Sequence, residues 1–253
     1  MLTSLPPGEV LAPGGAVQRR APRRAELRSL VSSVWTTVVP ADAGTLRVLP
    51  DAAIDLVFAD GRLVVAGPDT VACLETLPAG RPVLGFQLRP GAVAGALGLP
   101  ASAVRDQRVD VRDLWGADGR DLVDAMAEAA TVGAAADRLE GFLVRRTAGF
   151  APDRLAGAIV AQLRTGRRVD PDALGLGDRQ LRRRCVASFG YGLRTLGRIV
   201  RFQSTVELLG GRPTMPLSDA AAALGYVDQA HLTHEVGAFS SLTPRALRAE
   251  MSG

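Results

Sequence analysis

The strongest constraint on the fold of this chain is a pattern that occurs twice in its C-terminal part. Each copy predicts a short helix, a turn that contains glycine, and a second helix that begins with polar side chains. The copies are DALGLGDRQLRRRCVASFGYG (172–192) and AAAALGYVDQAHLTHEVGAFSSLTP (220–244). A sharp reversal between helices uses glycine because the turn requires backbone angles that other residues avoid. The sequence therefore predicts two pairs of short helices, each pair bent at a tight turn.

The segment between the two copies predicts one long amphipathic helix over 192–211. A helix of about 19 residues is about 28 Å long at roughly 1.5 Å per residue. With half of each flanking unit added, the span approaches the ~34 Å repeat of one turn of DNA. The major groove admits one α-helix. The spacing thus favours two helix-turn-helix units that place their second helices in successive major grooves without a dimer.

Charge is distributed unevenly along the 253 residues. Residues 1–151 hold 16 Arg against 17 Asp plus Glu, a net charge of −1, whereas residues 152–253 hold 14 Arg against 9 acids, a net charge of +5. The C-terminal part is therefore the place to look for a polyanionic partner. Phe150-Ala151-Pro152 interrupts the helical pattern, and we expect a domain boundary there, with domains at 1–151 and 152–253.

The N-terminal half predicts an α+β domain, a small antiparallel sheet or partial barrel plus helices, followed by an all-α domain with two helix-turn-helix units. Asp60-Gly61 between two apolar runs is a hairpin signal. The five expected strands lie at 45–50, 53–59, 62–67, 70–77 and 82–90. The expected helices lie at 25–35, 91–98, 101–104, 119–130 and 133–148. Helices are also expected at 153–166, 170–177, 178–190, 217–225, 228–239 and 243–251, with Asp153, Ser218, Asp228 and Thr243 as N-caps.

Composition excludes several classes. There is no run of about 18 apolar residues, so no membrane span is expected, and the N-terminus lacks the pattern of a secretory signal. Cys73 and Cys185 are the only cysteines, and we expect free thiols in the cytoplasm, with a regulatory pair as the alternative. RRAPRR (19–24) is interpreted as a solvated lead-in, with a nucleic-acid-binding arm as the alternative.

Residues 152–253 resemble the AraC-type transcription regulators. The resemblance is carried by LGLGDRQLRRRCVASFGYGLRTLGRIVRFQ and by LSDAAAALGYVDQAHLTHEVGAFSSLTPRAL. The N-terminal part is similar to a sensor-type domain of poorly defined role that precedes this module in some members, through VLPDAAIDLVFADGRLVVAGPDT, LGFQLRPGAVAGALGLPASAV and RVDVRDLWG. The resemblance implies a bacterial, cytoplasmic regulator that binds double-stranded promoter DNA, as a monomer or a homodimer. RNA polymerase and a small-molecule effector are further candidate partners.

The resemblance also implies roles for individual side chains. Arginine can bind guanine through two parallel hydrogen bonds, whereas contacts to phosphate set register more than sequence. The base-reading candidates are Arg179, Arg182 and Arg183 in the first unit and Gln229, Ala230, Thr233 and His234 in the second. The candidate phosphate contacts are Arg194, Arg198 and Thr243. For any one of these arginines, a solvated helix face is the alternative.

The second unit departs from the family pattern. Relatives commonly have Arg at the position of His234, Phe at Val236, a basic pair at Gly237-Ala238 and Gly at Ser241; in the first unit they commonly have Phe at Cys185. The first bracing helix, which starts at Asp170-Pro171, also looks short. We therefore expect the first unit to supply most of the affinity for DNA.

Other chemistries are less well supported. His231 and His234 lie three apart beside Glu235, but no further Cys or His completes a metal site. Asp51, Asp55 and Asp60 suggest a catalytic pair, but no histidine or nucleophile motif accompanies them, and turn or sheet-edge roles are expected instead. No enzyme activity, metal or cofactor is predicted.

The role of the N-terminal domain stays open at this point. It either binds an effector or serves as a scaffold for a protein partner; a third alternative is an enzyme whose expression the C-terminal part controls. A pocket between the sheet and the helices lined by Trp35, Phe58, Phe86 and Leu88 is conceivable, but these side chains are expected to be plain core.

Overall fold

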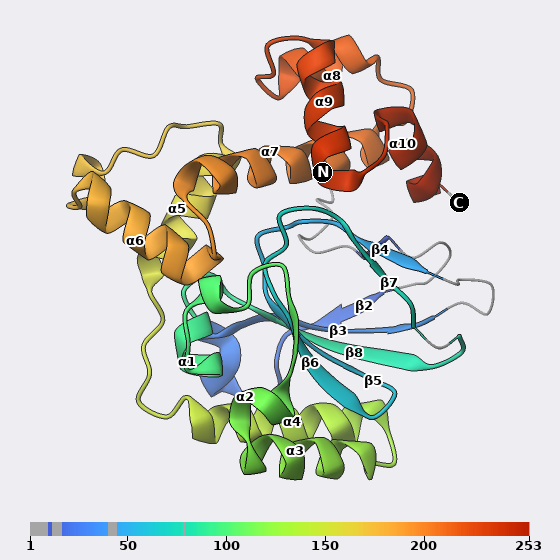
Figure 1. Cartoon of the computed structure of the whole chain (residues 1–253), viewed down its shortest axis with the longest axis vertical. Coiled ribbons are helices and arrows are strands. Elements are labelled where there is room, and N and C mark those ends of the chain that lie inside the picture. The colour runs from blue at the N-terminus through green and yellow to red at the C-terminus, as the bar shows by residue number, and fades with distance from the viewer. Residues whose placement is uncertain (1–9, 12–16, 40–44, 78, 253) are drawn as a thin grey trace.

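The computed structural model describes residues 10–11, 17–39, 45–77 and 79–252. Most of the N-terminal stretch on which the absence of a secretory signal was judged lies outside these residues. Figure 1 shows a β-sheet body with helices below it, and a second, helical body above it and to its left. The expected α+β domain followed by an all-α domain is confirmed.

The β-sheet body consists of two antiparallel sheets. The larger has the strand order β2-β3-β8-β5-β6-β9 and the smaller the order β1-β4-β7. The larger sheet is formed by β2 (Gln18–Arg20), β3 (Val31–Val38), β8 (Pro82–Leu88), β5 (Asp55–Ala59), β6 (Arg62–Ala66) and β9 (Arg108–Asp110). The smaller is formed by β1 (Val10–Leu11), β4 (Leu46–Val48) and β7 (Cys73–Glu75).

The Asp60-Gly61 hairpin is present as expected. Ala59 pairs with Arg62 across it, and both turn residues have positive φ, 48° and 72°. A two-residue turn with two positive φ angles is the form that the twist of a hairpin favours.

The segment 25–35 differs from the expected helix. A five-residue 3-10 helix, η1 (Ala25–Ser29), is followed directly by β3, which pairs with both β2 and β8. The apolar spacing of Leu30, Val31 and Val34 suits either period over so short a run, and the β-branched residues that follow favour the strand. That segment therefore leads from a short 3-10 turn into a central strand of the larger sheet.

Side chains alternate between the two faces of the larger sheet, as the two-residue period of a strand requires. One face packs under helices: Leu56, Val65 and Phe86 are fully buried there in the main N-terminal core. The opposite face carries Trp35, Asp55 and their neighbours toward the smaller sheet. Phe86 and Leu88 are therefore core, as expected, and the hollow lies on the face away from the helices.

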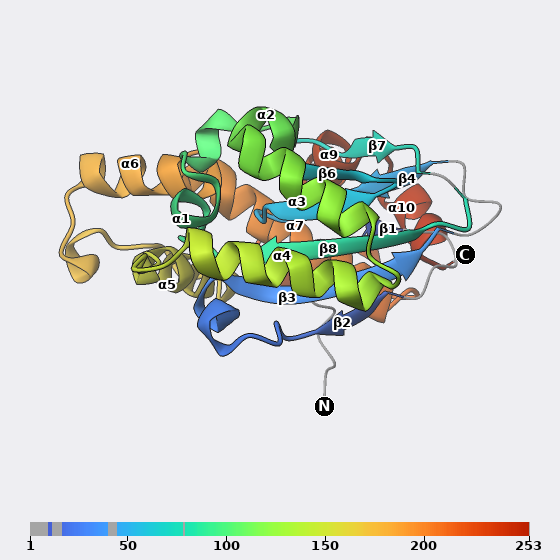
Figure 2. The ribbon, with the colours of Figure 1, turned by 90° about the horizontal axis from the view of Figure 1, so that it is seen from below.

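Helices cover the first face. Figure 2 shows α3 and α4 running side by side along the larger sheet. The helical elements of this half are α1 (Val93–Leu97), η2 (Ala101–Ala103), α2 (Val111–Trp115), α3 (Ala117–Ala127) and α4 (Val132–Arg146). The expected helices of this region are confirmed with shifts of a few residues; α2 and β9 were not anticipated.

RRAPRR is anchored to the protein surface. Arg20 forms an ion pair at 3.0 Å with Glu140, whose carboxylate also accepts hydrogen bonds from the backbone N–H groups of Arg23 and Arg24. Arg23 pairs with Asp137 at 2.9 Å. The segment leads into η1 with Arg23 and Arg24 exposed, as expected, but these contacts also tie it to α4, so it is not a free basic arm.

The helical body comprises α5 (Arg154–Arg164), η3 (Asp172–Leu174), α6 (Asp178–Phe189), α7 (Leu193–Gly211), α8 (Leu217–Ala223), α9 (Gln229–Ser240) and α10 (Pro244–Ser252). These helices share one apolar core, whose members range from Ala156 to Leu247 and include Leu49 of the N-terminal half. Within the described residues, no helix is both long and apolar enough to cross a bilayer.

Candidate nucleic-acid interface

The first unit consists of η3, a turn and α6. Its bracing element is reduced to a three-residue 3-10 turn that ends at Gly175, where φ is +65°. Leu181, Cys185 and Phe189 anchor one face of α6 in the core. The helix begins after Gly177, whose N–H donates to Oε1 of Gln180 at 3.2 Å. The bracing element is thus short, as expected from the sequence.

The opposite face of α6 carries an exposed cluster of arginines. Arg179, Arg182 and Arg183 are all solvent-exposed, and none of them has a hydrogen bond or ion pair within the described residues. Arg184 differs, because it pairs with Asp153 at 3.0 Å and so ties α6 to the start of α5. The three free guanidinium groups occupy the first two turns of α6, the part of a recognition helix that contacts bases.

The second unit consists of α8, a turn and α9. The chain reverses at Gly225, where φ is +69°. Oδ1 of Asp228 accepts a hydrogen bond from the N–H of His231 at 2.7 Å, so the expected N-cap of α9 is confirmed. Ser218 is not the cap of α8, which begins after Pro216; its hydroxyl donates to Asp219 instead.

The polar side of α9 is open to solvent. Gln229, Ala230 and His234 are exposed, and Thr233 is half-buried. Leu232, Val236 and Phe239 hold the other side of the helix in the core. The polar residues of the opening turns are thus presented outward, with fewer cations than on α6.

The two units lie at opposite ends of α7 (Figure 1). This helix has 19 residues, so the expected length of about 28 Å holds. Arg194 is exposed near its start, on the side of α7 away from the fully buried Leu196. Thr243 caps α10 by accepting from the N–H of Ala246 at 3.2 Å and remains exposed.

The guanidinium group of Arg198 is bound by another side chain of the protein. Its guanidinium donates to both carboxylate oxygens of Glu235 on α9, the shortest contact being 2.7 Å, and stacks 5.0 Å from the Phe239 ring. Burial works to raise the pKa of Glu235, but hydrogen bonds from Arg198 and the charges of Arg198 and Arg201 outweigh it and lower that pKa. The arrangement supports a bracing role for Arg198, joining α7 to α9.

Sequence reasoning overlooked two neighbours of this brace. Arg201 lies 3.6 Å from Glu235 and 4.5 Å from the centre of the Tyr226 ring. The Tyr226 hydroxyl shares a 2.8 Å hydrogen bond with Thr205. The signal for the Arg201–Glu235 pair is the position of Arg201, one turn after Arg198 on a helix that the sequence already predicts.

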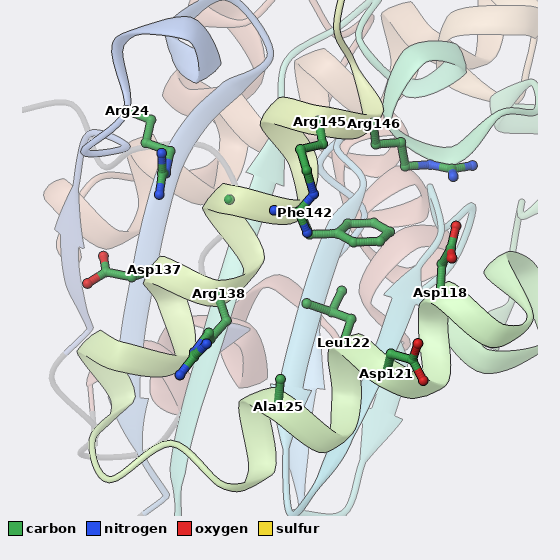
Figure 3. Close-up of a pocket in the computed structure, with 11 residues that line it drawn as sticks. Arg24, Asp118, Asp121, Leu122, Ala125, Asp137, Arg138, Phe142, Arg145 and Arg146 are labelled. Carbon is green, nitrogen blue, oxygen red and sulfur yellow. The ribbon is translucent and has the colours of Figure 1, made fainter.

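The structure also contains two hollows outside the helix-turn-helix units. Figure 3 shows the first, an open groove between α3 and α4 with Asp118 and Asp121 on one side and Arg138 and Arg145 on the other. The second is a cavity of about 410 Å³ between the two sheets, lined by Trp35, apolar strand residues and several carboxylates. A cavity of this size is within the usual range for small-molecule sites.

The carboxylates of the cavity correct an expectation. All three acids line the cavity, Asp60 from the hairpin turn, as expected, and Asp51 and Asp55 from positions that are neither turn tip nor sheet edge. Asp55 is on β5 inside the sheet, and its Oδ1 accepts from Nε1 of Trp35 at 2.7 Å. The Trp35 indole lies against Gly85, where an added Cβ would be 1.9 Å from a ring atom. Gly85 therefore lets the indole reach Asp55.

Neither cysteine takes part in a site. Both are free, and Cys185 is fully buried. Burial raises the pKa of the Cys185 thiol to about 11, which suits a core residue. Among the described residues, no group of three or more His, Cys, Asp or Glu side chains is arranged to hold a metal ion.

The fold defines the class: a two-domain protein whose C-terminal domain carries two helix-turn-helix units. Residues 172–250 match a family described as "Helix-turn-helix domain", and residues 18–110 match a "Domain of unknown function (DUF6597)". Residues 172–250 therefore form an AraC-type helix-turn-helix domain, and residues 18–110 form a domain of the second family.

Further comparisons give distant similarity. No curated protein matches the sequence. Solved structures of ToxT from Vibrio cholerae are similar over 94% of this chain and 98% of theirs, at 11% identity. Their TM-scores are 0.43 for the P21 form and 0.44 for the protein from strain O395. Another structure of the O395 protein, bound to (E)-4-(8-methylnaphthalen-1-yl)but-3-enoic acid, has the same coverage and identity and a TM-score of 0.43.

Proposed function

We propose that this protein regulates transcription by placing α6 and α9 in successive major grooves of promoter DNA. The observation that carries the proposal is the outward presentation of Arg179, Arg182 and Arg183 at one end of α7 and of Gln229 and His234 at the other. The net charge of +5 over residues 152–253 supports a polyanionic partner. Its place of action is the bacterial cytoplasm, where promoter DNA is found.

The two units are proposed to contribute unequally. The exposed face of α6 carries three arginines without an ion-pair partner among the described residues: Arg179, Arg182 and Arg183. The exposed base-reading candidates of α9 are Gln229, Ala230 and His234, and none of them is an arginine. Cations that neutralise phosphates or bind guanine supply most of the affinity in such interfaces. Arg194 and Thr243 are proposed to contact phosphates, and Arg198 to hold the two helices together.

One chain is proposed to be sufficient for binding, because α7 alone separates the two reading helices by nearly one turn of DNA. We also propose that a small molecule in the cavity controls this binding. A cavity of ligand size favours that role over a scaffold without a ligand.

Gel-shift titration tests the unequal contributions. DNA from the region upstream of the protein's own gene is the first target. The double variant Arg182→Ala/Arg183→Ala is expected to lose about 100-fold or more in affinity and to flatten the salt dependence, because two charge contacts are removed. The variant Gln229→Ala/His234→Ala is expected to lose less.

Arg138→Ala is the matched control, since it removes an exposed arginine from α4, far from the helical body. It should leave binding unchanged. The reverse ranking of the two double variants would refute the dominance of the first unit, and unchanged binding in both would refute the interface itself.

A further inference from the structure

The cavity between the sheets has apolar walls with carboxylates set among them. Its apolar lining comes from both sheets and includes Leu46 and Val48 of β4 and Val57 and Val64 of the larger sheet. Its charged lining comprises Asp51, Asp55, Asp60, Asp69 and Glu75 against Arg62 and Arg108. Carboxylates outnumber guanidinium groups in this lining, so the cavity is acidic.

Three of these carboxylates already have a cation, and the most exposed of them, Asp60, lies 3.8 Å from Arg81. Arg108 donates to both oxygens of Asp69, at 2.8 and 2.9 Å, and its Nε lies 2.5 Å from Glu75. Burial lowers the pKa of Arg108, but these hydrogen bonds outweigh it and the pKa is raised overall. The hydrogen bonds of Arg108 to carboxylates thus go to Asp69 and Glu75, and its charge acts on the pKa of Asp55 only as a lesser cause.

Asp51 and Asp55 accept hydrogen bonds from neutral donors. Asp51 accepts from the N–H of Ala53 at 2.9 Å and from Nε2 of Gln87 at 3.3 Å, and Asp55 accepts from Trp35. Loss of water around the cavity wall raises the pKa of both carboxyls, that of Asp51 to about 7, with the charge of Asp55 as the next cause. The Trp35 hydrogen bond and the charge of Arg19 act to lower the pKa of Asp55, but they do not offset the loss of water.

The helical body also contains a buried polar group near the junction of the two bodies. The hydroxyl of Tyr191, in the turn between α6 and α7, is buried, with the residue 4% exposed, and has no hydrogen-bond partner within the described residues. Burial, and then the charges of Asp51, Asp69 and Asp106, raise the pKa of Tyr191. Tyr191 does not line the cavity, so its hydroxyl is not part of that site.

We propose that the cavity binds a small organic cation, an amine or guanidinium compound with a short apolar body, through Asp51 and Asp55. A carboxylate removed from water is stabilised by an opposite charge within a few ångströms, and the apolar strand residues and Trp35 suit the remainder of such a molecule. A metal ion is a poorer match, since among the described residues two carboxylates and an amide do not complete a ligand set.

The same wall of the cavity is bonded to the helical body. Pro50, next to Asp51, accepts a 2.5 Å hydrogen bond from Nε2 of Gln203 on α7, and Leu49 is buried in the core of that body. Ala72, beside β7, donates to the carbonyl of Phe239 on α9 at 2.7 Å. An occupant that contacts residues 49–53 therefore acts on α7, the helix that sets the spacing of the reading helices, a consequence that rests on the proposed function.

Thermal-shift and calorimetric titrations of the full chain test the cation. The probes are 2-phenylethylamine, 1,4-diaminobutane and agmatine, with 2-phenylethanol and 1,4-butanediol as uncharged matches. At least one amine is expected to raise Tm by several degrees at millimolar concentration, because it binds the folded form only, while its alcohol does not. Below pH 7 binding should release a proton, since the cation favours ionised Asp51.

Variants locate the site. Asp51→Asn and Asp55→Asn should reduce the affinity for the amine at least tenfold, while Asp118→Asn, in the groove between α3 and α4, should leave it unchanged. Asparagine at 55 retains an oxygen for Trp35, so folding is preserved. No shift with any of the three amines, equal shifts with the alcohols, or full binding by both variants would overturn the proposal.

The titrations contain no DNA, which keeps the two proposals separable. Amine binding without any effect on gel shifts would refute control by the cavity while leaving its ligand class intact. DNA binding without amine binding would support the proposed role of α6 and α9 and would refute the proposal that the cavity binds an organic cation.

Discussion

At the scale of single residues, the acids that line the cavity depart most from ordinary behaviour. Asp51 accepts its hydrogen bonds from a backbone N–H and an amide, whereas Glu140 and Glu235, both buried, are each paired with arginine. Carboxylates that lose water without gaining a compensating cation oppose folding when they ionise. Natural proteins retain such groups chiefly where function uses them.

The pH dependence of stability reports on Asp51. Its folded pKa of about 7 lies above its ordinary value of 3.8, because the cavity wall desolvates the carboxylate, so the folded state holds the proton more tightly. Stability contributed by this group falls as pH rises from about 4 to 7 and is constant above that. Asp51→Asn should therefore stabilise the protein by about 1–3 kcal/mol at pH 8 and by little at pH 4.

Urea unfolding of wild type and Asp51→Asn at both pH values measures this difference. Asp124→Asn, at an exposed position on α3 outside the cavity, is the control and should show no such trend. A variant that is less stable than wild type at pH 8 would contradict the presence of an uncompensated charge in the cavity wall.

At the scale of elements, α9 has a well-capped N-terminus and a C-terminus with an unfavourable backbone conformation. The Asp228 cap secures its first turn, but the helix ends at Ser241 with φ of +60°, a left-handed conformation that favours glycine. Gly237 inside the helix is not required by space, since an added Cβ would meet nothing closer than 3.9 Å. Both departures from the family pattern reduce the intrinsic stability of the second recognition helix.

Ser241→Gly should raise stability by about 0.5–1 kcal/mol, because glycine adopts the left-handed conformation without steric conflict. Thermal unfolding gives the change. Ala187→Gly, at an exposed position inside α6, is the opposite control and should lower stability by a similar amount. Destabilisation by Ser241→Gly would show that the serine side chain contributes a contact of its own.

At the scale of the whole molecule, the sheet body and the helical body form one interface. In addition to the Gln203–Pro50 and Ala72–Phe239 bonds, Arg47 on β4 pairs with Glu250 at 3.1 Å and donates to the carbonyl of Ser240 at the end of α9. Arg105 donates to the carbonyl of Gly190 between α6 and α7 at 3.1 Å. The N-terminal domain thus touches the helical body near both recognition helices.

Gln203→Met should weaken this interface. It keeps the volume of the side chain but leaves the Pro50 carbonyl without its donor, a loss of about 1–3 kcal/mol. Differential scanning calorimetry should show a lower or broader transition. Gln229→Met, exposed on α9, should not change it; an unchanged transition in both variants would mean that the Gln203 bond does not couple the bodies.

Much of the helical body could be predicted from the sequence, because its determinants are local. Caps such as Asp153 and Asp228, the turn at Gly225 and the apolar spacing of 192–211 each act within a few residues. The segment 25–35 was misassigned because a short apolar run fits two periods, and only pairing with β8, about fifty residues away, settles it as a strand. The candidate recognition residues followed from position in the double motif, whereas the pairing of Arg198 with Glu235 did not.

The sequence by itself determined the two helix-turn-helix units, the long helix α7 between them and the concentration of positive charge in the C-terminal part. Local hydrogen bonds and helix periodicity specify these features within short stretches of chain. Only the tertiary structure decided that Asp51, Asp55 and Trp35 line one cavity, and that its wall is bonded to α7 and α9. Those groups come from separate strands and loops, and what brings them together is the alternation of side chains across a sheet whose register depends on distant pairing.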